Sequence, residues 1–292
     1  MANRENVFGR FFLVASNARD ALTADDGISG MVPFSIDGIC VYSGYHNDFG
    51  PMNLGTIFKF CALVDKMLND HPDRSIALAT QSDEKTLTNA VFLVGAYMII
   101  RLDYKPFEVQ SRFEYLQEEL TAFRDVSPGP QNFDLMLRDC WDGLWKGKTL
   151  NWVRSGKNGF DLQGYEHFGC ALNGCVHEII PGKFLALRGP KSLQTDKNWD
   201  DTFDKEGRFI CRDFTPEYYI HVLHHFKVQV LTLKHFSYTY AKILNQISRQ
   251  LCDSTLPNTT GRLSQLRAYQ WLSWHSKIAP SRRRTLWANF LS

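Results

Sequence analysis

Histidine and cysteine are the residues of this sequence most able to bind a metal, and they form two clusters. The first lies within eleven positions and comprises His167, Cys170, Cys175 and His177. Zinc accepts imidazole and thiolate ligands, but this spacing matches none of the common zinc motifs. The second shares one predicted helix at spacings of three and four positions: His221, His224 and His225. Because such histidines more often form a polar helix face, we expect neither a metal nor a cofactor.

Basic and aromatic residues near the C-terminal end could contact nucleic acid. Residues 254–292 contain six basic residues and no acidic one, and Trp271, Trp274 and Trp287 could stack on bases. Six charges without a recognisable binding module are a weak indication, so nucleic acid is a disfavoured partner. The apolar positions there keep no clean period, so we predict no packed structure for this tail.

The overall composition is that of a globular protein. Of 292 residues, 44% are hydrophobic and 22% charged, and the net charge of +2 favours no class of partner. The longest apolar run, Val91–Ile100, is shorter than a membrane span of about 18–20 residues and predicts a buried helix. The N-terminus shows no secretory pattern, and the seven cysteines are scattered. We therefore predict a soluble intracellular protein with reduced thiols and no membrane contact.

Residues 34–148 alternate strand-like and helix-like patterns. Short runs at Ile39–Tyr42 and Ser75–Thr80 predict strands, and a polar loop is predicted at Gln81–Thr86. Apolar spacing and proline positions predict helices at Leu54–Leu68, Asn89–Ile100, Pro106–Leu120 and Asn132–Lys146. Strand, loop and helix in this order are typical of an α/β fold with a parallel sheet.

A second α/β unit is predicted to begin after a loop at Gly147–Gly164. Lys183–Leu187 predicts a strand between Pro-Gly and Gly-Pro pairs, and the highly charged stretch Asp196–Arg212 predicts a surface loop. Thr215 and the following proline open a predicted helix, and the next strand is predicted at Val228–Thr232.

Six motifs occur in an order and spacing that resemble a known family. They are Phe34-Ser-Ile-Asp37, Asp48-Phe-Gly-Pro-Met-Asn-Leu54, Asn89-Ala-Val-Phe-Leu-Val-Gly-Ala-Tyr97, Phe123-Arg-Asp125, Tyr165-Glu-His167 and Ile180-Pro-Gly-Lys-Phe-Leu-Ala186. Together, over residues 5–232, they resemble the N-terminal part of the cell-division-cycle fourteen family, the dual-specificity phosphatases of mitotic exit. The resemblance implies two tandem phosphatase-like domains. The first is non-catalytic and shapes specificity, and the second carries the nucleophile.

Catalysis of this kind needs a thiolate in a His-Cys-x5-Arg loop, whose backbone amides and arginine bind the phosphoryl oxygens. The residues six positions after the seven cysteines are His46, Met67, Lys146, Val176, Pro181, Glu217 and Asn258. None is arginine, and no cysteine follows a histidine. The catalytic motif is therefore absent from this sequence, and we assign no catalytic residue.

The first predicted domain carries the same loop in a degenerate form. Gln81 takes the place of the nucleophile, and Leu87 takes the place of the arginine. A glutamine cannot form a cysteinyl-phosphate intermediate, a leucine cannot hold a dianion, and Asp83 would repel phosphate. We therefore interpret residues 81–87 as a vestigial structural loop rather than an active site.

In the resembled family, an acidic groove between the domains receives basic residues that follow the substrate's phosphoserine. Its carboxylates follow the Tyr-Glu-His motif, and here Glu166 matches, whereas the next two acidic positions fall on Gly169 and Cys175. Asp161 lies nearby in the sequence. The resemblance implies that Glu166, with Asp161, binds substrate. An exposed ion pair contributes only about 0–1 kcal/mol, so a solvated acidic surface is the alternative.

The resemblance stops at Thr232, within a predicted strand, and we expect that an alternative transcript or an unrecognised intron replaced the remaining sequence. The predicted fold class is α/β, a dual-specificity-phosphatase-like parallel sheet with flanking helices plus a truncated second unit of the same kind. The predicted organisation is a non-catalytic phosphatase-like domain (5–150), a linker (151–180), the start of the second domain (181–232) and a divergent basic tail (233–292).

The resemblance implies a dual-specificity protein phosphatase that acts on phosphoserine and phosphotyrosine proteins in cell-cycle control. This chain would be mainly the substrate-recognition half, a truncated pseudophosphatase that is inactive alone. The alternative is a non-catalytic binding or scaffold protein, so whether the chain acts as an enzyme stays open. Phosphoproteins are the expected partners, a homodimer stays open, and the expected location is the nucleus and cytoplasm.

Overall fold

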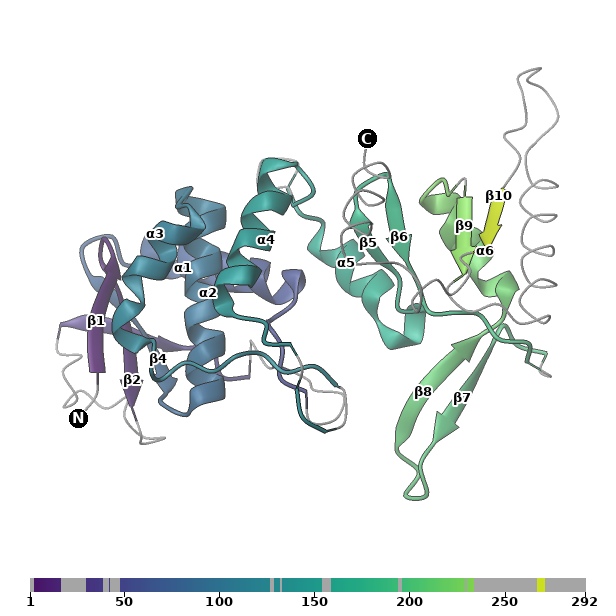
Figure 1. Cartoon of the computed structure of the whole chain (residues 1–292), viewed down its shortest axis with the longest axis horizontal. Coiled ribbons are helices and arrows are strands. Elements are labelled where there is room, and N and C mark those ends of the chain that lie inside the picture. The colour runs from purple at the N-terminus through teal and green to yellow at the C-terminus, as the bar shows by residue number, and fades with distance from the viewer. Residues whose placement is uncertain are drawn as a thin grey trace, which may run out of the picture. The chain divides into compact units, whose positions relative to one another are not determined.

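The computed structural model describes residues 3–16, 30–38, 42, 48–126, 129–131, 133–153, 159–193, 196–228, 230–233 and 267–270. The chain forms two compact units, an N-terminal unit (Met1–Gly164) and a C-terminal unit (Tyr165–Ser292) (Figure 1). The division falls inside 151–180, the segment predicted as a linker, part of which is helix and strand. The predicted domain limits themselves stay predictions.

The N-terminal unit contains a four-stranded sheet. Its strands are β1 (Asn3–Phe8), β2 (Phe11–Ser16), β3 (Met31–Ser35) and β4 (Ser75–Gln81), in the spatial order β1-β2-β4-β3. β4 runs parallel to both β2 and β3, and β1 is an antiparallel edge strand. The strand predicted at Ser75–Thr80 is therefore confirmed as the centre of a parallel arrangement. Most of the strand predicted at Ile39–Tyr42 lies outside the described residues.

Helices accompany this sheet, and one of them packs against the other three described α-helices of the unit. They are α1 (Leu54–Asp70), α2 (Glu84–Leu102), α3 (Pro106–Arg112), the 3-10 turn η1 (Glu114–Leu116) and α4 (Leu137–Thr149). α2 packs against β4, α1, α3 and α4 (Figure 1). The predicted α/β class, a sheet with parallel strands and flanking helices, is confirmed.

The core of the N-terminal unit forms around α2. Its residues Leu87–Ile100 are all buried, as expected for a helix without a polar face. In β4, Ile76 and Leu78 join the same core, whereas Ala77 points to the other side of the sheet. By length and composition α2 could cross a membrane, but 78% of its apolar stretch is buried inside the structure, which is usual for a core helix.

Two helices depart from their predicted limits for identifiable reasons. The helix predicted at Pro106–Leu120 ends at Arg112, because Phe113 turns inward to stack on Trp141 with ring centroids 6.0 Å apart. The helix predicted from Asn132 begins only at Leu137. The backbone carbonyl of Leu135 accepts a hydrogen bond from Phe123 N at 2.9 Å, so the chain before α4 stays extended.

The described part of the C-terminal unit begins with a helix, a turn and a hairpin. They are α5 (Leu162–Gly169), which begins at the end of the N-terminal unit, η2 (Ala171–Asn173), and the antiparallel strands β5 (His177–Ile180) and β6 (Phe184–Ala186). α6 (Pro216–His225) follows, with Pro216 at its first position as predicted. The strand predicted at Lys183–Leu187 is confirmed as β6.

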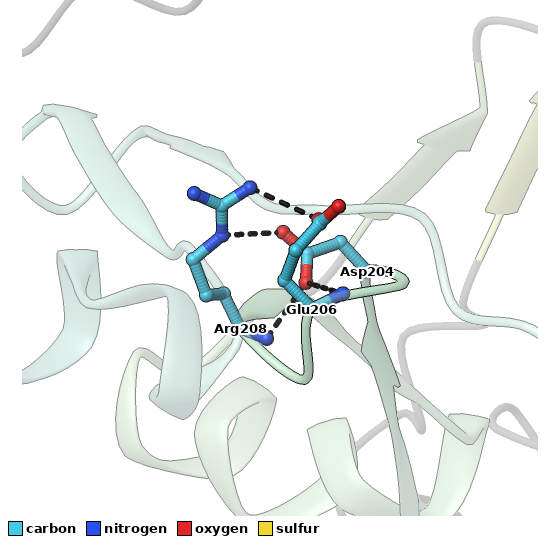
Figure 2. Close-up of polar contacts among 3 residues, drawn as sticks. All are labelled: Asp204, Glu206 and Arg208. Atoms are coloured by element: carbon cyan, nitrogen blue, oxygen red, sulfur yellow. Dashed lines mark hydrogen bonds and ion pairs between the residues drawn. The ribbon is translucent and has the colours of Figure 1, made fainter.

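The prediction of a surface loop over Asp196–Arg212 is wrong. Most of this stretch forms an antiparallel hairpin of β7 (Trp199–Phe203) and β8 (Phe209–Phe214). Figure 2 shows its turn, where the Asp204 carboxylate accepts bonds from the backbone N–H groups of Glu206 and Arg208 at 3.0 and 2.8 Å. The charged side chains therefore stabilise the turn instead of preventing strand formation.

A small core holds the C-terminal unit together. It consists of Val176, Phe214, Tyr219, Val222 and Leu223. Beyond α6, β9 (Val230–Leu233) pairs in parallel with β10 (Arg267–Gln270). β10 lies in the tail (254–292), for which the sequence predicts no packed structure. The described residues of this tail form a strand and so depart from that prediction. That this unit is a truncated copy of the first stays a prediction.

We predict that Gly95→Ala destabilises the protein by about 1–3 kcal/mol, the usual cost of overpacking a core. A Cβ at Gly95 in α2 would lie 2.5 Å from Trp141 Cε2, and the Trp141 indole is fixed by its bond to the Phe92 carbonyl at 3.2 Å. Urea denaturation followed by circular dichroism measures the change.

Gly143→Ala provides the matched control in the neighbouring helix α4. A Cβ there meets nothing within 4 Å, so the substitution should stabilise α4 by about 1 kcal/mol through helix propensity. Similar effects of the two substitutions would contradict the close approach of α2 and α4.

Candidate functional site

The segment between β4 and α2, predicted as a degenerate phosphate loop, is very short. α2 begins at Glu84, so the polar loop predicted to extend to Thr86 is limited to Ser82 and Asp83. Gln81, at the end of β4, is half-buried and pairs with Ser16 of β2. The helix starts early because Asp83 caps it, so its first turn uses residues that the sequence pattern assigned to the loop.

The N-terminus of α2 is closed by its own acidic residue. The Asp83 carboxylate accepts a hydrogen bond from Thr86 N at 3.0 Å, and the Asp83 carbonyl accepts one from Leu87 N at 2.9 Å. Free amide groups at a helix start are the groups that bind phosphate. Here an amide of the first turn already has a negatively charged partner, and Glu84 adds a second negative charge.

Leu87 belongs to the core of the N-terminal unit. It is fully buried in the cluster around α2, so it faces away from any ligand that approaches the loop. The three residues of the predicted loop therefore have structural roles: Gln81 ends β4, Asp83 caps α2 and Leu87 lies in the core. Their assignment as a vestigial loop stays a prediction, but these three side chains themselves offer neither a thiol nucleophile nor a cation for a phosphate.

The motif at residues 48–54 also makes structural contacts in the described part of the chain. Asp48 Oδ2 accepts a hydrogen bond from the Tyr42 hydroxyl at 2.5 Å. Asn53 caps α1 by accepting a bond from Thr56 N at 2.9 Å. Phe49 forms a backbone bridge with Arg124 of the Phe123-Arg-Asp125 motif, so these two distant motifs hold each other.

One of the two predicted substrate-binding carboxylates lies just before α5 and the other lies within it. Asp161 precedes the helix, and its Oδ1 accepts a bond from Gly164 N at 2.9 Å, which is an N-cap contact. Glu166 is an exposed residue of the helix itself. At 100° per residue, five positions separate them by about 140° around the axis, so the helix does not place them on one face. Their role in binding substrate stays a prediction.

The histidine and cysteine clusters do not assemble a metal site in the part of the chain that the structure describes. No three His, Cys, Asp or Glu side chains converge there to hold an ion. His167 lies in α5 and His177 in β5, where burial lowers the pKa of His177 below its ordinary value. The three histidines of α6 are exposed, as predicted for a polar face.

Residues 5–147 match the family model described as the N-terminal half of dual specificity protein phosphatases. This segment is similar to the N-terminal domain of those phosphatases. The match covers the sheet from β1 to β4 and nearly all of α1 to α4. The resemblance to this family that the sequence motifs indicated is confirmed, whereas the non-catalytic character of the segment stays a prediction.

Curated relatives of this phosphatase domain carry the same family name. The chain is 35% identical over 161 residues to human dual specificity protein phosphatase CDC14C, covering 54% of this chain and 36% of the relative. Mouse CDC14A is 35% identical over 160 residues, covering 54% and 26%. Tyrosine-protein phosphatase cdc-14 of Caenorhabditis elegans is 30% identical over 168 residues, covering 54% and 23%. The aligned part therefore spans about a third or less of these relatives.

The residues that cap the N-termini of α1 and α2 were not predicted from the sequence. Both helices start with an Asn or Asp whose side chain accepts from a threonine amide three positions on, at Asn53 and Asp83. The pattern Asn/Asp-x-x-Thr before an apolar run was the available signal for these caps in this phosphatase domain.

We predict that Asp83→Ala lowers the free energy of unfolding by about 0.5–2 kcal/mol through loss of the α2 cap. Asp83→Asn keeps an acceptor oxygen for Thr86 N, so it should cost much less. Urea titrations of both variants measure the difference. Equal losses would mean that the charge of Asp83, rather than the capping bond, stabilises the helix start.

We predict that Tyr42 stabilises the protein in a pH-dependent way. Burial, together with the hydrogen bond to Asp48, raises the pKa of Tyr42 to about 12. Because an unfolded tyrosine has a pKa of about 10, this stabilisation is complete below pH 10 and is lost as the pH rises towards 12. The unfolding free energies of wild type and Tyr42→Phe should therefore converge between pH 10 and pH 12. A constant difference would contradict this prediction.

Proposed function

We propose that this chain is the substrate-recognition half of a dual-specificity protein phosphatase that acts on phosphoserine and phosphotyrosine proteins in cell-cycle control. We further propose that the chain alone is inactive. The observation that carries the proposal is the closed N-terminus of α2, where Asp83 occupies an amide group that an anion would need. The family of residues 5–147 supports it, because that model describes the N-terminal half of such enzymes.

The chemistry of phosphate-ester hydrolysis supports the proposed inactivity. A thiolate must attack phosphorus, and a cation with several amide groups must hold the developing charge. No cysteine of the sequence is followed by arginine at the sixth position. Between β4 and α2, Gln81 provides no nucleophile, and the buried Leu87 provides no charge. Substrate binding is then the role that remains for this domain.

Glu166 is the residue proposed to bind a basic side chain of the substrate. It lies exposed in α5, within the Tyr-Glu-His motif. Its carboxylate would form a charge-assisted hydrogen bond with a lysine or arginine that follows the phosphoserine. An exposed pair of this kind contributes at most about 1 kcal/mol, so its removal should weaken binding about fivefold. Asp161, which caps α5, is proposed to contribute through its charge alone.

The second candidate is a non-catalytic binding or scaffold protein. It is favoured by the structural surroundings of Gln81, Asp83 and Leu87, because none of these three side chains is available to bind phosphate. In this case the domain would retain partners of the full enzyme without regard to their phosphorylation. Nuclear and cytoplasmic location and self-association are proposals under either function.

We predict that the purified chain does not hydrolyse para-nitrophenyl phosphate or a phosphoserine-proline peptide with a following lysine. The same peptide should still bind, as measured by fluorescence anisotropy, and Glu166→Lys should abolish most of that binding because it replaces attraction by repulsion. The full-length relative CDC14A serves as the positive control for turnover.

Glu118→Lys is the matched control variant for charge. Glu118 is exposed in the N-terminal unit, and its substitution changes the net charge by the same amount as Glu166→Lys. Binding that survives Glu118→Lys but not Glu166→Lys supports the recognition role. Turnover that increases with protein concentration would overturn the proposed inactivity, and equal binding of the unphosphorylated peptide would favour the scaffold function.

A further inference from the structure

A tight turn in the C-terminal unit brings two cysteines together. The segment Cys170-Ala-Leu-Asn-Gly-Cys175 connects α5 to β5 and contains the single 3-10 turn η2. Both cysteines are free and partly exposed, so small reagents can reach them. Zinc would accept both thiols as ligands, but the described residues assemble no metal site. Metal binding therefore does not account for the proximity of Cys170 and Cys175.

The backbone closes this turn on itself. Cys175 N donates a hydrogen bond to the Cys170 carbonyl at 3.2 Å, and the next residue, Val176, donates to Phe168 at 2.8 Å. Gly174 and Cys175 have φ angles of 100° and 49°, and these left-handed residues reverse the chain. A direct backbone bond of this length places the two Cα atoms about 5–7 Å apart, and disulfides need about 4.4–6.8 Å.

The turn is also held against the rest of its unit. The buried Tyr219 of α6 donates its hydroxyl to the Gly174 carbonyl at 3.1 Å. The Asn173 side chain donates to the His167 carbonyl at 2.9 Å, which ties the turn to the end of α5. Because both sides of the turn are anchored, the cysteines stay close without support from a covalent bond.

We propose that Cys170 and Cys175 form a reversible disulfide that responds to the thiol–disulfide balance of the solution. The thiolate of one cysteine attacks a low-molecular-weight disulfide such as glutathione disulfide, which releases one glutathione and leaves a mixed disulfide. The second thiolate then attacks the protein sulfur of that bond and releases the other glutathione. Two protein thiols are oxidised, and one glutathione disulfide is reduced to two glutathiones.

The disulfide would lock the turn that follows α5, the helix that carries Glu166. The Cys170 amide bonds to the Glu166 carbonyl at 3.2 Å, so the turn starts directly on the last turn of this helix. A fixed turn would hold the end of α5 against fraying. This inference goes beyond the proposed function and does not depend on it, because it concerns only the chemistry of two side chains.

Other cysteines provide internal comparisons. Burial raises the pKa of the Cys61 thiol to about 12 and that of Cys140 to about 11, so both should react slowly at neutral pH. Cys211 of β8 is the competing partner, because Arg188 hydrogen-bonds to Cys211 and also interacts with the charge of Cys175. A disulfide between Cys175 and Cys211 is therefore the alternative product.

The test is oxidation of the full chain with glutathione disulfide, alkylation of the remaining thiols with iodoacetamide, and peptide mapping by mass spectrometry. We expect a peptide that contains the Cys170–Cys175 link and is about 2 Da lighter than its reduced form, and dithiothreitol should reverse the change. Alkylation of both cysteines should fall to about a tenth of that in the reduced protein. Cys170→Ser and Cys175→Ser should each abolish the linked peptide.

Cys211→Ser is the matched control, and it should leave the linked peptide unchanged. A Cys175–Cys211 link in the wild-type chain would overturn the proposal, as would stable glutathione adducts on Cys170 or Cys175 without an internal link. Unchanged far-ultraviolet circular dichroism of the serine variants shows that a lost link reflects missing sulfur rather than unfolding.

Discussion

Burial of α2 on all sides is the constraint on which the N-terminal unit depends. The helix contacts the central strand β4 and three further helices, and its residues Leu87–Ile100 are all inside the core. Such a helix has no polar face to guide its position, so close contacts must hold it. Gly95 allows Trp141 to approach the backbone, and Lys148 donates to the carbonyls of Ile99 and Ile100 at 2.6 and 3.1 Å.

The same burial limits the chemistry at the start of α2. A helix that starts immediately after a buried strand has only a short connection, and here Asp83 both makes that connection and caps the helix. Leu87 faces the core because the helix surface is apolar from that position onward. An anion would have to displace the Asp83 carboxylate and tolerate Glu84, so the start of α2 is poorly suited to bind phosphate.

Ion pairs link separate segments in the described part of the C-terminal unit. Among the described residues its core has five buried side chains, and Asp213 joins Arg188 and Lys191 through ion pairs of 2.7 Å. Arg212 forms a two-bonded pair with Asp201 across the β7–β8 hairpin, at 2.6 and 2.8 Å. These contacts lie between residues distant in sequence, so charge content alone could not separate a surface loop from a hairpin there.

The sequence by itself determined the α/β class, the central strand, α1, the buried stretch of α2 and the family, because apolar spacing and ordered motifs are local properties. Tertiary structure decided where α3 ends and α4 begins, since Phe113 stacks on Trp141 and Leu135 pairs with Phe123. It also decided that Asp83 caps a helix and that Asp161 and Glu166 lie on different sides of α5. These outcomes depend on which backbone N–H and C=O groups lack a hydrogen-bond partner nearby in the sequence. Only the folded chain determines which groups those are.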